Sequence, residues 1–194
     1  MESYLYALIS TYVPEHFELL TFLAGGKLIK EERQGKTYAN GVLHSFDDKP
    51  AVINTYGTKF WFKNGKMHRD CDLPAVIWED GTQEWYKNDK LHRDGDKPAI
   101  IFNNKAQEWY KNGESHRDND LPAVIWADGT RLWYKNGKQH RDGDLPAVIG
   151  ANGSQRWFKN GKLHRDGDLP AVIWENGSRY WYKNGIIISH KLEI

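Results

Sequence analysis

Short runs of apolar residues alternate with turn-forming residues along most of the chain. A typical stretch has the apolar run AVIW at residues 75–78, Asp80-Gly81 as a tight turn, and a return strand over residues 82–87. β-Branched and aromatic residues favour strands, and Asp-Gly or Asn-Gly pairs supply the left-handed residues of hairpin turns. A second turn signal, usually Asn-Gly, follows the return strand. The pattern therefore predicts a series of β-hairpins.

The register of the hairpin depends on the length of its turn. With a two-residue turn, Val76 lies opposite Trp85 and Trp78 lies opposite Gln83. Both tryptophans and Val76 then share one face of the sheet. The third copy has Asn104-Lys105 where the others have Asp-Gly or Asn-Gly, so its turn is the weakest prediction of the series.

The hairpin recurs at a constant interval of 24 residues, which is the signature of a repeat architecture. Proline begins the apolar strand in six copies, at Pro50, Pro74, Pro98, Pro122, Pro146 and Pro170. A tryptophan column consists of Trp61, Trp85, Trp109, Trp133, Trp157 and Trp181. A histidine column consists of His44, His68, His92, His116, His140 and His164. An aspartate column consists of Asp48, Asp72, Asp96, Asp120, Asp144 and Asp168.

These observations predict an all-β fold, an elongated antiparallel meander of about six β-hairpin repeats. Each unit contacts mainly its neighbours, and two strands per unit at about 4.8 Å each give a rise of about 10 Å per repeat. Identical columns then become structural ladders along the sheet. We expect the tryptophan column to form the core.

The two ends of the chain depart from the repeat. Residues 3–12 and 15–23, separated by Pro14, are predicted to form two short helices, so that residues 1–26 are a helical cap or a docking segment. Residues 27–194 form the β-repeat domain. Its last segment, 186–194, alternates apolar and polar residues and is predicted to be a strand. This strand either caps its own sheet or pairs with another copy of the chain.

Composition excludes several classes of protein. The chain carries 27 Lys and Arg against 26 Asp and Glu, a formal charge of +1, which disfavours binding to nucleic acid. The single cysteine, Cys71, excludes an intrachain disulfide, and it falls in a column whose other members tolerate positive φ. No run reaches the roughly 18 apolar residues of a membrane span. We therefore expect a soluble intracellular protein with no transmembrane segment.

The recurring His-Arg-Asp tripeptide suggests catalysis only superficially. It resembles part of a kinase catalytic loop, but the other kinase motifs are absent from the sequence, and five copies do not make one active site. We expect no enzyme activity, no catalytic residue and no cofactor. The charges of the Lys, Arg and Asp columns are expected to form ion pairs between repeats.

Histidine and aspartate in this connector also suggest a metal ladder. His164, Asp166 and Asp168 combine imidazole and carboxylate groups, which suit divalent ions. The alternative is structural: Asp168 accepts backbone N–H bonds, and His164 stacks on neighbouring histidines or bonds a carbonyl. Recurrence in every unit favours the structural role, because a folding device must be copied with each repeat. We predict no metal site.

Function is expected where the repeat varies. One column changes freely while its neighbours stay fixed, and such a column is either unconstrained surface or a surface that contacts a partner. Together with the apolar positions of the terminal strand, the candidate partner-contact residues are Phe60, Glu84, Glu108, Leu132, Arg156, Tyr180, Ile188, Leu192 and Ile194.

The segments WYKNGKQHRDGDLPAVI and WENGSRYWYKNG resemble MORN-type repeats. The closer resemblance is to the variant with HRDGDLPAVIW, which is abundant in proteins of giant DNA viruses, the marseilleviruses especially, and it covers residues 36–185. It implies a single-layer repeat sheet that acts as a non-catalytic scaffold for protein contacts. It also implies a viral structural or host-interaction protein, in the virion or the host cytoplasm. The alternative is a module that binds phosphoinositide head groups or glycans along the repeat face.

Overall fold

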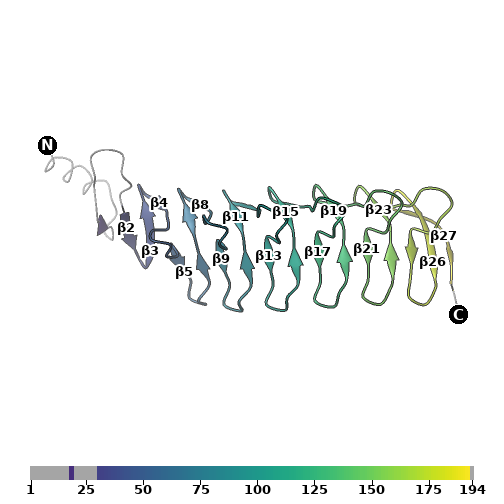
Figure 1. Cartoon of the computed structure of the whole chain (residues 1–194), viewed down its shortest axis with the longest axis horizontal. Helices are drawn as coiled ribbons and strands as arrows, with labels where there is room; N and C mark the ends of the chain where they lie inside the picture. Colours follow the sequence, from purple (N-terminus) through teal and green to yellow (C-terminus); the bar gives the residue numbers. More distant parts are fainter. Residues whose placement is uncertain (1–17, 20–29, 193–194) are drawn as a thin grey trace.

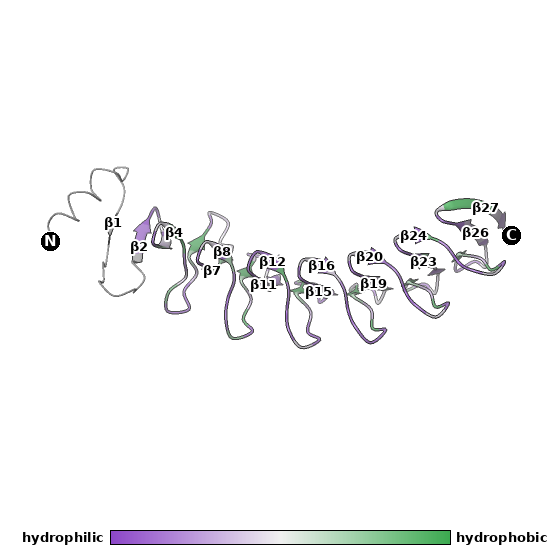
Figure 2. Cartoon of the chain, turned by 90° about the horizontal axis from the view of Figure 1, so that it is seen from above, coloured by the Kyte–Doolittle hydropathy of each residue, from purple (hydrophilic) through white to green (hydrophobic). Residues whose placement is uncertain are grey.

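The structure is a computed structural model, and it describes residues 18–19 and 30–192. All regular elements in these residues are strands, and none is a helix. Figure 1 shows a row of similar hairpins that runs from the N-terminal to the C-terminal end, and Figure 2 shows that the row curves gently when it is seen from above. The predicted all-β meander of hairpin repeats is confirmed.

The main sheet takes two strands from each unit. The first strands are Val52–Ile53 (β5), Val76–Ile77 (β9), Ile100–Ile101 (β13), Val124–Ile125 (β17), Val148–Ile149 (β21) and Val172–Ile173 (β25). The second strands are Lys59–Phe60 (β6), Gln83–Glu84 (β10), Gln107–Glu108 (β14), Arg131–Leu132 (β18), Gln155–Arg156 (β22) and Arg179–Lys183 (β26). The strand Ile186–Lys191 (β27) ends the sheet beside β26. All neighbours are antiparallel, and consecutive units pair through β6–β9, β10–β13, β14–β17, β18–β21 and β22–β25.

A smaller hairpin follows each of the first five large ones. These are Phe62–Lys63 (β7) with Lys66–Met67 (β8), Tyr86–Lys87 (β11) with Lys90–Leu91 (β12), Tyr110–Lys111 (β15) with Glu114–Ser115 (β16), Tyr134–Lys135 (β19) with Lys138–Gln139 (β20), and Phe158–Lys159 (β23) with Lys162–Leu163 (β24). Their two-residue turns have both central residues at positive φ, as Asn112 (55°) and Gly113 (90°) show. This is the geometry that Asn-Gly favours.

The tryptophan of each unit lies at the corner between the large and the small hairpin. The backbone N–H of Trp85 donates to the carbonyl of Ala99 in the next unit (2.8 Å), and its carbonyl accepts from the N–H of His92 (3.0 Å). One residue thus bonds to two different segments. This division of bonds explains why most strands of the sheet are only two residues long.

The register of the large hairpin differs from the prediction. Val76 pairs with Glu84, and the N–H of Trp78 donates to the carbonyl of Thr82 (2.9 Å), so the turn has three residues. The third of these residues is Gly81, at φ 87°. A three-residue turn with glycine in this conformation is a common alternative to the two-residue turn. The placement of Trp85 opposite Val76 was therefore wrong.

The core consists of three columns that repeat in register. The alanine column is fully buried, at 0 % exposed: Ala51, Ala75, Ala99, Ala123, Ala147 and Ala171. The β-branched column is 1–8 % exposed: Val76, Ile100, Val124, Val148 and Val172. The tryptophan column is 4–6 % exposed: Trp61, Trp85, Trp109, Trp133 and Trp157. These five tryptophans are core residues, as predicted, whereas Trp181 in the last unit is partly exposed.

A small sheet precedes the repeats. Its strands are Glu18–Leu19 (β1), Lys30–Arg33 (β2), Lys36–Ala39 (β3) and Val42–Leu43 (β4), in that order. The predicted helix over 15–23 is wrong at Glu18–Leu19, because this segment pairs with β2 and extends the sheet. The predicted helix over 3–12 lies outside the described residues. Within those residues, the structure holds no helix long and apolar enough to cross a membrane.

Candidate functional site: the connector face and the exposed tryptophans

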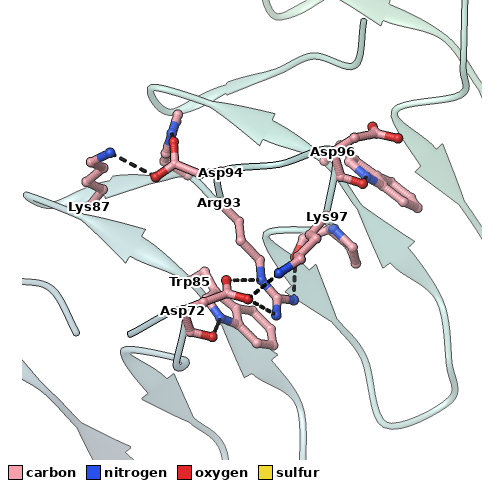
Figure 3. A network of polar contacts seen from close by, with 10 residues as sticks. Asp72, Trp85, Lys87, Arg93, Asp94, Asp96 and Lys97 are labelled. Carbon is pink, nitrogen blue, oxygen red and sulfur yellow. Dashed lines mark hydrogen bonds and ion pairs between the residues drawn. The ribbon is translucent and has the colours of Figure 1, made fainter. Parts of the chain in front are cut away.

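The connector between units, which carries His-Arg-Asp, covers one face of the sheet, here called the connector face. In the second unit, the indole Nε1 of Trp85 donates to the carbonyl of Asp72 (3.0 Å), and the guanidinium of Arg93 lies 3.8 Å from the centre of the indole ring. Arg93 also makes a two-pronged pair with the Asp72 carboxylate (2.7 and 3.1 Å) and donates to the carbonyl of Pro98 (3.3 Å). Lys97 reaches the same carboxylate at 2.7 Å (Figure 3). Arg93 and then Lys97 lower the pKa of Asp72 to about 2.

This Arg–Trp–Asp arrangement recurs in five units. Each arginine stacks on a tryptophan at 3.8–3.9 Å and pairs with an aspartate 21 residues earlier, so it bonds one repeat to the next. The arginines are Arg69, Arg93, Arg117, Arg141 and Arg165. Their side chains are only 12–14 % exposed. The predicted ion pairs between repeats are confirmed for the arginine and aspartate columns.

The histidine column makes a second set of bonds between units. In His92, Nδ1 accepts from the backbone N–H of Asn112 in the next unit (3.1 Å), and Nε2 lies 2.9 Å from Asp94. A backbone N–H can only donate, so Nδ1 must be unprotonated and Nε2 carries the proton. Lys87 joins Asp94 at 2.9 Å. The imidazole of His92 therefore links the backbone of the next unit to a carboxylate of its own connector.

Two expectations about these columns were wrong. The histidines do not bond a carbonyl, because their Nδ1 atoms accept from Asn N–H groups, as His164 does from Asn184 (3.1 Å). The lysine pairs lie within one unit, seven residues apart in sequence, as in Lys159 with Asp166 (2.9 Å). Lysine reaches the aspartate that is already bound by histidine, because the small hairpin folds back over the connector that follows it.

The connector face assembles no metal centre in the part of the chain that the structure describes, since no three His, Cys, Asp or Glu side chains converge there. His164 meets Asp166 at 2.9 Å, but Asp168 takes no part in that contact. Cys71 is exposed and has φ 61°, which agrees with its assignment to a turn column. The lysine and arginine side chains that line the grooves between connectors form ion pairs with aspartates of the connector face.

The opposite face of the large hairpins exposes tryptophan. Trp78, Trp126 and Trp174 are 41 %, 44 % and 42 % exposed, and we call them the exposed tryptophan row. They recur in every second unit, so about 20 Å separates neighbours at two strands of about 4.8 Å per unit. Solvent-exposed tryptophan at regular spacing is uncommon for a side chain of this size. The row therefore requires an explanation that the core does not provide.

The variable column lies beside this row. The indole of Trp78 donates to the Glu84 carboxylate (2.8 Å) and meets Phe60 edge-on, with 6.4 Å between ring centres. Arg156 lies 5.7 Å from the ring of Trp174. The predicted contact residues of this column (Phe60, Glu84, Glu108, Leu132, Arg156 and Tyr180) are all half-buried. These residues form a surface, partly polar and partly apolar, beside the exposed tryptophans.

Tyrosines from the small hairpins contact the carboxylates of the variable column. The hydroxyl of Tyr110 donates to Glu108 (2.8 Å). Burial, and then the nearby Glu84 carboxylate, raises the pKa of Tyr86 well above its ordinary value. The tyrosine hydroxyls therefore remain donors at all physiological pH values, and their contacts fix the carboxylates of the variable column.

The sequence did not single out the exposed tryptophan row as a site. Its signal was present, because the same column holds Asn54, Phe102 and Gly150 in the alternate units. A core column does not tolerate glycine and tryptophan in turn. The two-residue turn hid this signal by placing Trp78 on the same face as the buried Trp85.

The terminal strand holds the remaining predicted contact residues. Ile188 is 62 % exposed and Leu192 is 56 % exposed, while Ile194 lies outside the described residues. Ile186, at 70 % exposed, extends the same apolar edge, which is green at the C-terminal end of Figure 2. Among the described residues, no strand lies on the outer side of β27.

The fold and these faces define the chain as an all-β hairpin-repeat protein. Comparisons with protein-family models, with curated protein sequences and with solved structures gave no match.

Proposed function

We propose that the chain is a non-catalytic repeat scaffold that binds a protein partner through the exposed tryptophan row and the variable column beside it. The observation that supports this proposal is the exposure of Trp78, Trp126 and Trp174, each above 40 %, along a column that varies in identity. Tryptophan, tyrosine and arginine are the residues most enriched among those that dominate binding energy at protein interfaces. The row supplies tryptophan, and the variable column beside it supplies Arg156 and Tyr180.

The row is also separate from the Arg–Asp ion pairs that join the repeats. Those bonds lie on the connector face, where the Arg–Trp–Asp contacts join one unit to the next. A partner can therefore cover the row without disturbing the fold. The resemblance to giant-virus repeats favours a partner in the virion or in the infected host cell.

The experiment compares the wild-type chain with the variant W78A/W126A/W174A as baits. Virions and lysates of infected cells are the sources, and captured proteins are then purified and titrated against both baits. We expect a partner that binds the wild type and loses at least about 100-fold in affinity for the triple variant, because two or more interface tryptophans are removed. The variant should retain the far-UV circular dichroism spectrum of the wild type.

Equal affinity of every captured protein for both baits would contradict the proposal. A glycan array and liposomes that contain phosphoinositide, probed with both chains, distinguish the alternative. Tryptophan-dependent binding to a glycan, without any protein partner, would replace the scaffold by a ligand-binding module.

A further inference from the structure

The Arg–Trp–Asp arrangement is incomplete in the last unit. The aspartate column has six members and ends at Asp168, whereas the arginine column has five and ends at Arg165. The residue 24 positions after Arg165 is Ser189. Within the described residues, no cation pairs with the Asp168 carboxylate. The last tryptophan, Trp181, likewise has no guanidinium over its ring.

The cause lies in the path of the chain. In the other units a connector follows the small hairpin and carries the arginine over the tryptophan. After Gly185, the chain instead runs straight back as β27, where Ser189 pairs opposite Trp181. The connector is missing, and Trp181 is partly exposed.

The hydrogen bond between the remaining two parts of the arrangement is kept. The indole Nε1 of Trp181 donates to the carbonyl of Asp168 at 3.0 Å, within the 2.9–3.2 Å range of the other five units. This bond fixes the ring relative to the loop that carries the carboxylate. The flat aromatic face is therefore placed as it is where arginine binds, whereas the backbone of Asp168 lacks the positive φ (48–57°) of the five aspartates that pair with arginine.

We propose that Trp181 and Asp168 form a binding site for the guanidinium of an arginine on another protein. In five units of the protein itself, an arginine fills the equivalent position. Its guanidinium lies 3.8–3.9 Å from the centre of the ring and makes a two-pronged pair with the carboxylate. Arginine fits better than lysine, because its planar guanidinium can stack on an aromatic ring and donate two hydrogen bonds to a carboxylate at the same time. The site lies at the C-terminal end of the sheet and does not include the exposed tryptophan row.

The partner is inferred to be an extended segment and not a free amino acid. An exposed ion pair and an exposed cation–π contact each contribute only about two- to five-fold to affinity. In the part of the chain that the structure describes, β27 is the last strand of the sheet and lies next to the site, so a further strand can pair with its outer edge. A segment that pairs with β27 and places an arginine over Trp181 uses both features.

Positive charge near the site does not exclude this occupant. Arg179 precedes Trp181 by two residues on β26, and Lys191 lies opposite Arg179. The fourth unit has the same feature, with Arg131 two residues before Trp133, and Arg141 still stacks on that ring at 3.9 Å. A cation at this position is thus compatible with a guanidinium on the tryptophan.

The test uses the full chain labelled with ¹⁵N and blocked seven-residue peptides of sequence TVTRTVT. Matched peptides carry lysine or citrulline in place of arginine, and citrulline keeps the shape without the charge. The indole N–H signal of Trp181 is assigned with the variant Trp181→Phe. We expect the arginine peptide to shift this signal with a millimolar Kd, the citrulline peptide to bind at least about five-fold more weakly, and lysine to fall between.

Variants of the chain locate the site. Asp168→Asn should weaken the arginine peptide about two- to five-fold, whereas Asp144→Asn, whose carboxylate is already held by Arg165, should leave its affinity unchanged. Ser189→Arg, which supplies a guanidinium opposite Trp181 within the chain, should reduce peptide binding. W78A/W126A/W174A should bind the peptide as tightly as the wild type, and this result separates the end site from the proposed scaffold surface.

The proposal is overturned if the arginine peptide leaves the Trp181 signal unmoved at about 10 mM. It is also overturned if citrulline and arginine peptides bind equally, or if the triple tryptophan variant loses the peptide. Each of these results assigns the last unit a purely capping role.

Discussion

The connector face and the exposed tryptophan row belong to the same hairpins but follow opposite rules. On the connector face, each arginine is 12–14 % exposed and bonds to the neighbouring unit, and the residue types hardly change. Along the row, Trp78, Trp126 and Trp174 are more than 40 % exposed, and the column alternates with Asn, Phe and Gly. Exact recurrence therefore marks the bonds that build the scaffold, and exposure with variation marks the surface available for recognition.

The largest contrast is expected between two tryptophans of the same unit. Trp133 is 6 % exposed and Trp126 is 44 % exposed. Replacing Trp133 by alanine should lower the free energy of unfolding by about 3–5 kcal/mol, because a buried indole leaves a cavity. Replacing Trp126 should cost less than about 1 kcal/mol. Urea denaturation followed by far-UV circular dichroism measures both.

The two substitutions serve as controls for each other, since both remove an indole. Similar losses of stability would show that the row is part of the core after all, and the distinction between the two faces would fail.

Low pH should destabilise the protein mainly through the carboxylates of the connector face. The pKa values of Asp72, Asp142 and Asp166 are lowered to about 2 by their Arg, Lys and His partners, against an ordinary value of 3.8. A lowered pKa means that the unfolded chain binds more protons than the folded chain in this interval. The contribution of these carboxylates is complete above about pH 4 and is lost as the pH falls toward 2.

Urea denaturation at a series of pH values between about 5 and 2 measures this loss. Asp72→Asn removes one titrating group and should make stability fall less steeply across the interval. Stability that stays constant down to the lowest pH would mean that the ion pairs of the connector face do not stabilise the fold.

The smallest effect concerns the turn on the side of the exposed row. Lys105 has φ 72° in the third unit, where the turn of the second unit has Gly81 at φ 87°. A residue with a side chain is strained in this conformation, so Lys105→Gly should raise the free energy of unfolding by about 0.5–1 kcal/mol. Thermal unfolding by calorimetry detects the gain, and the reverse change Gly81→Lys should lower stability by a similar amount. No change in either variant would show that the turns bear no strain.

Much of the fold could be predicted because the same strand and turn signals recur in every copy, so that a weak signal in one copy is supported by the others. The spacing of Pro74, Trp85 and Asp72 in successive copies, together with the Asn-Gly and Asp-Gly turns, was sufficient for the antiparallel meander. The register was not predictable, because Asp80-Gly81 suits both a two-residue and a three-residue turn. The predicted register was wrong by one residue. This error placed Trp78 on the same face as Trp85 and so hid the exposed row.

The bonds between units were predicted only as classes of interaction. The sequence indicated charge pairs, but it did not indicate that Arg93 stacks on Trp85 and reaches Asp72, 21 residues earlier, because that contact depends on how two hairpins lie side by side. The role of the histidines depended on a backbone donor, the N–H of Asn112, which no sequence pattern identifies. Contacts across the repeat boundary are thus the part that required coordinates.

The exposed tryptophans recur every 48 residues, whereas the scaffold recurs every 24, as the positions 78, 126 and 174 show. Duplication or loss of one unit in the gene would preserve every bond between neighbours and leave both ends intact. The same event would shift the tryptophans beyond it by one unit relative to those before it. The sheet can therefore lengthen in evolution by one unit at a time, whereas the regular alternation of the exposed tryptophans is kept only when units are gained or lost in pairs.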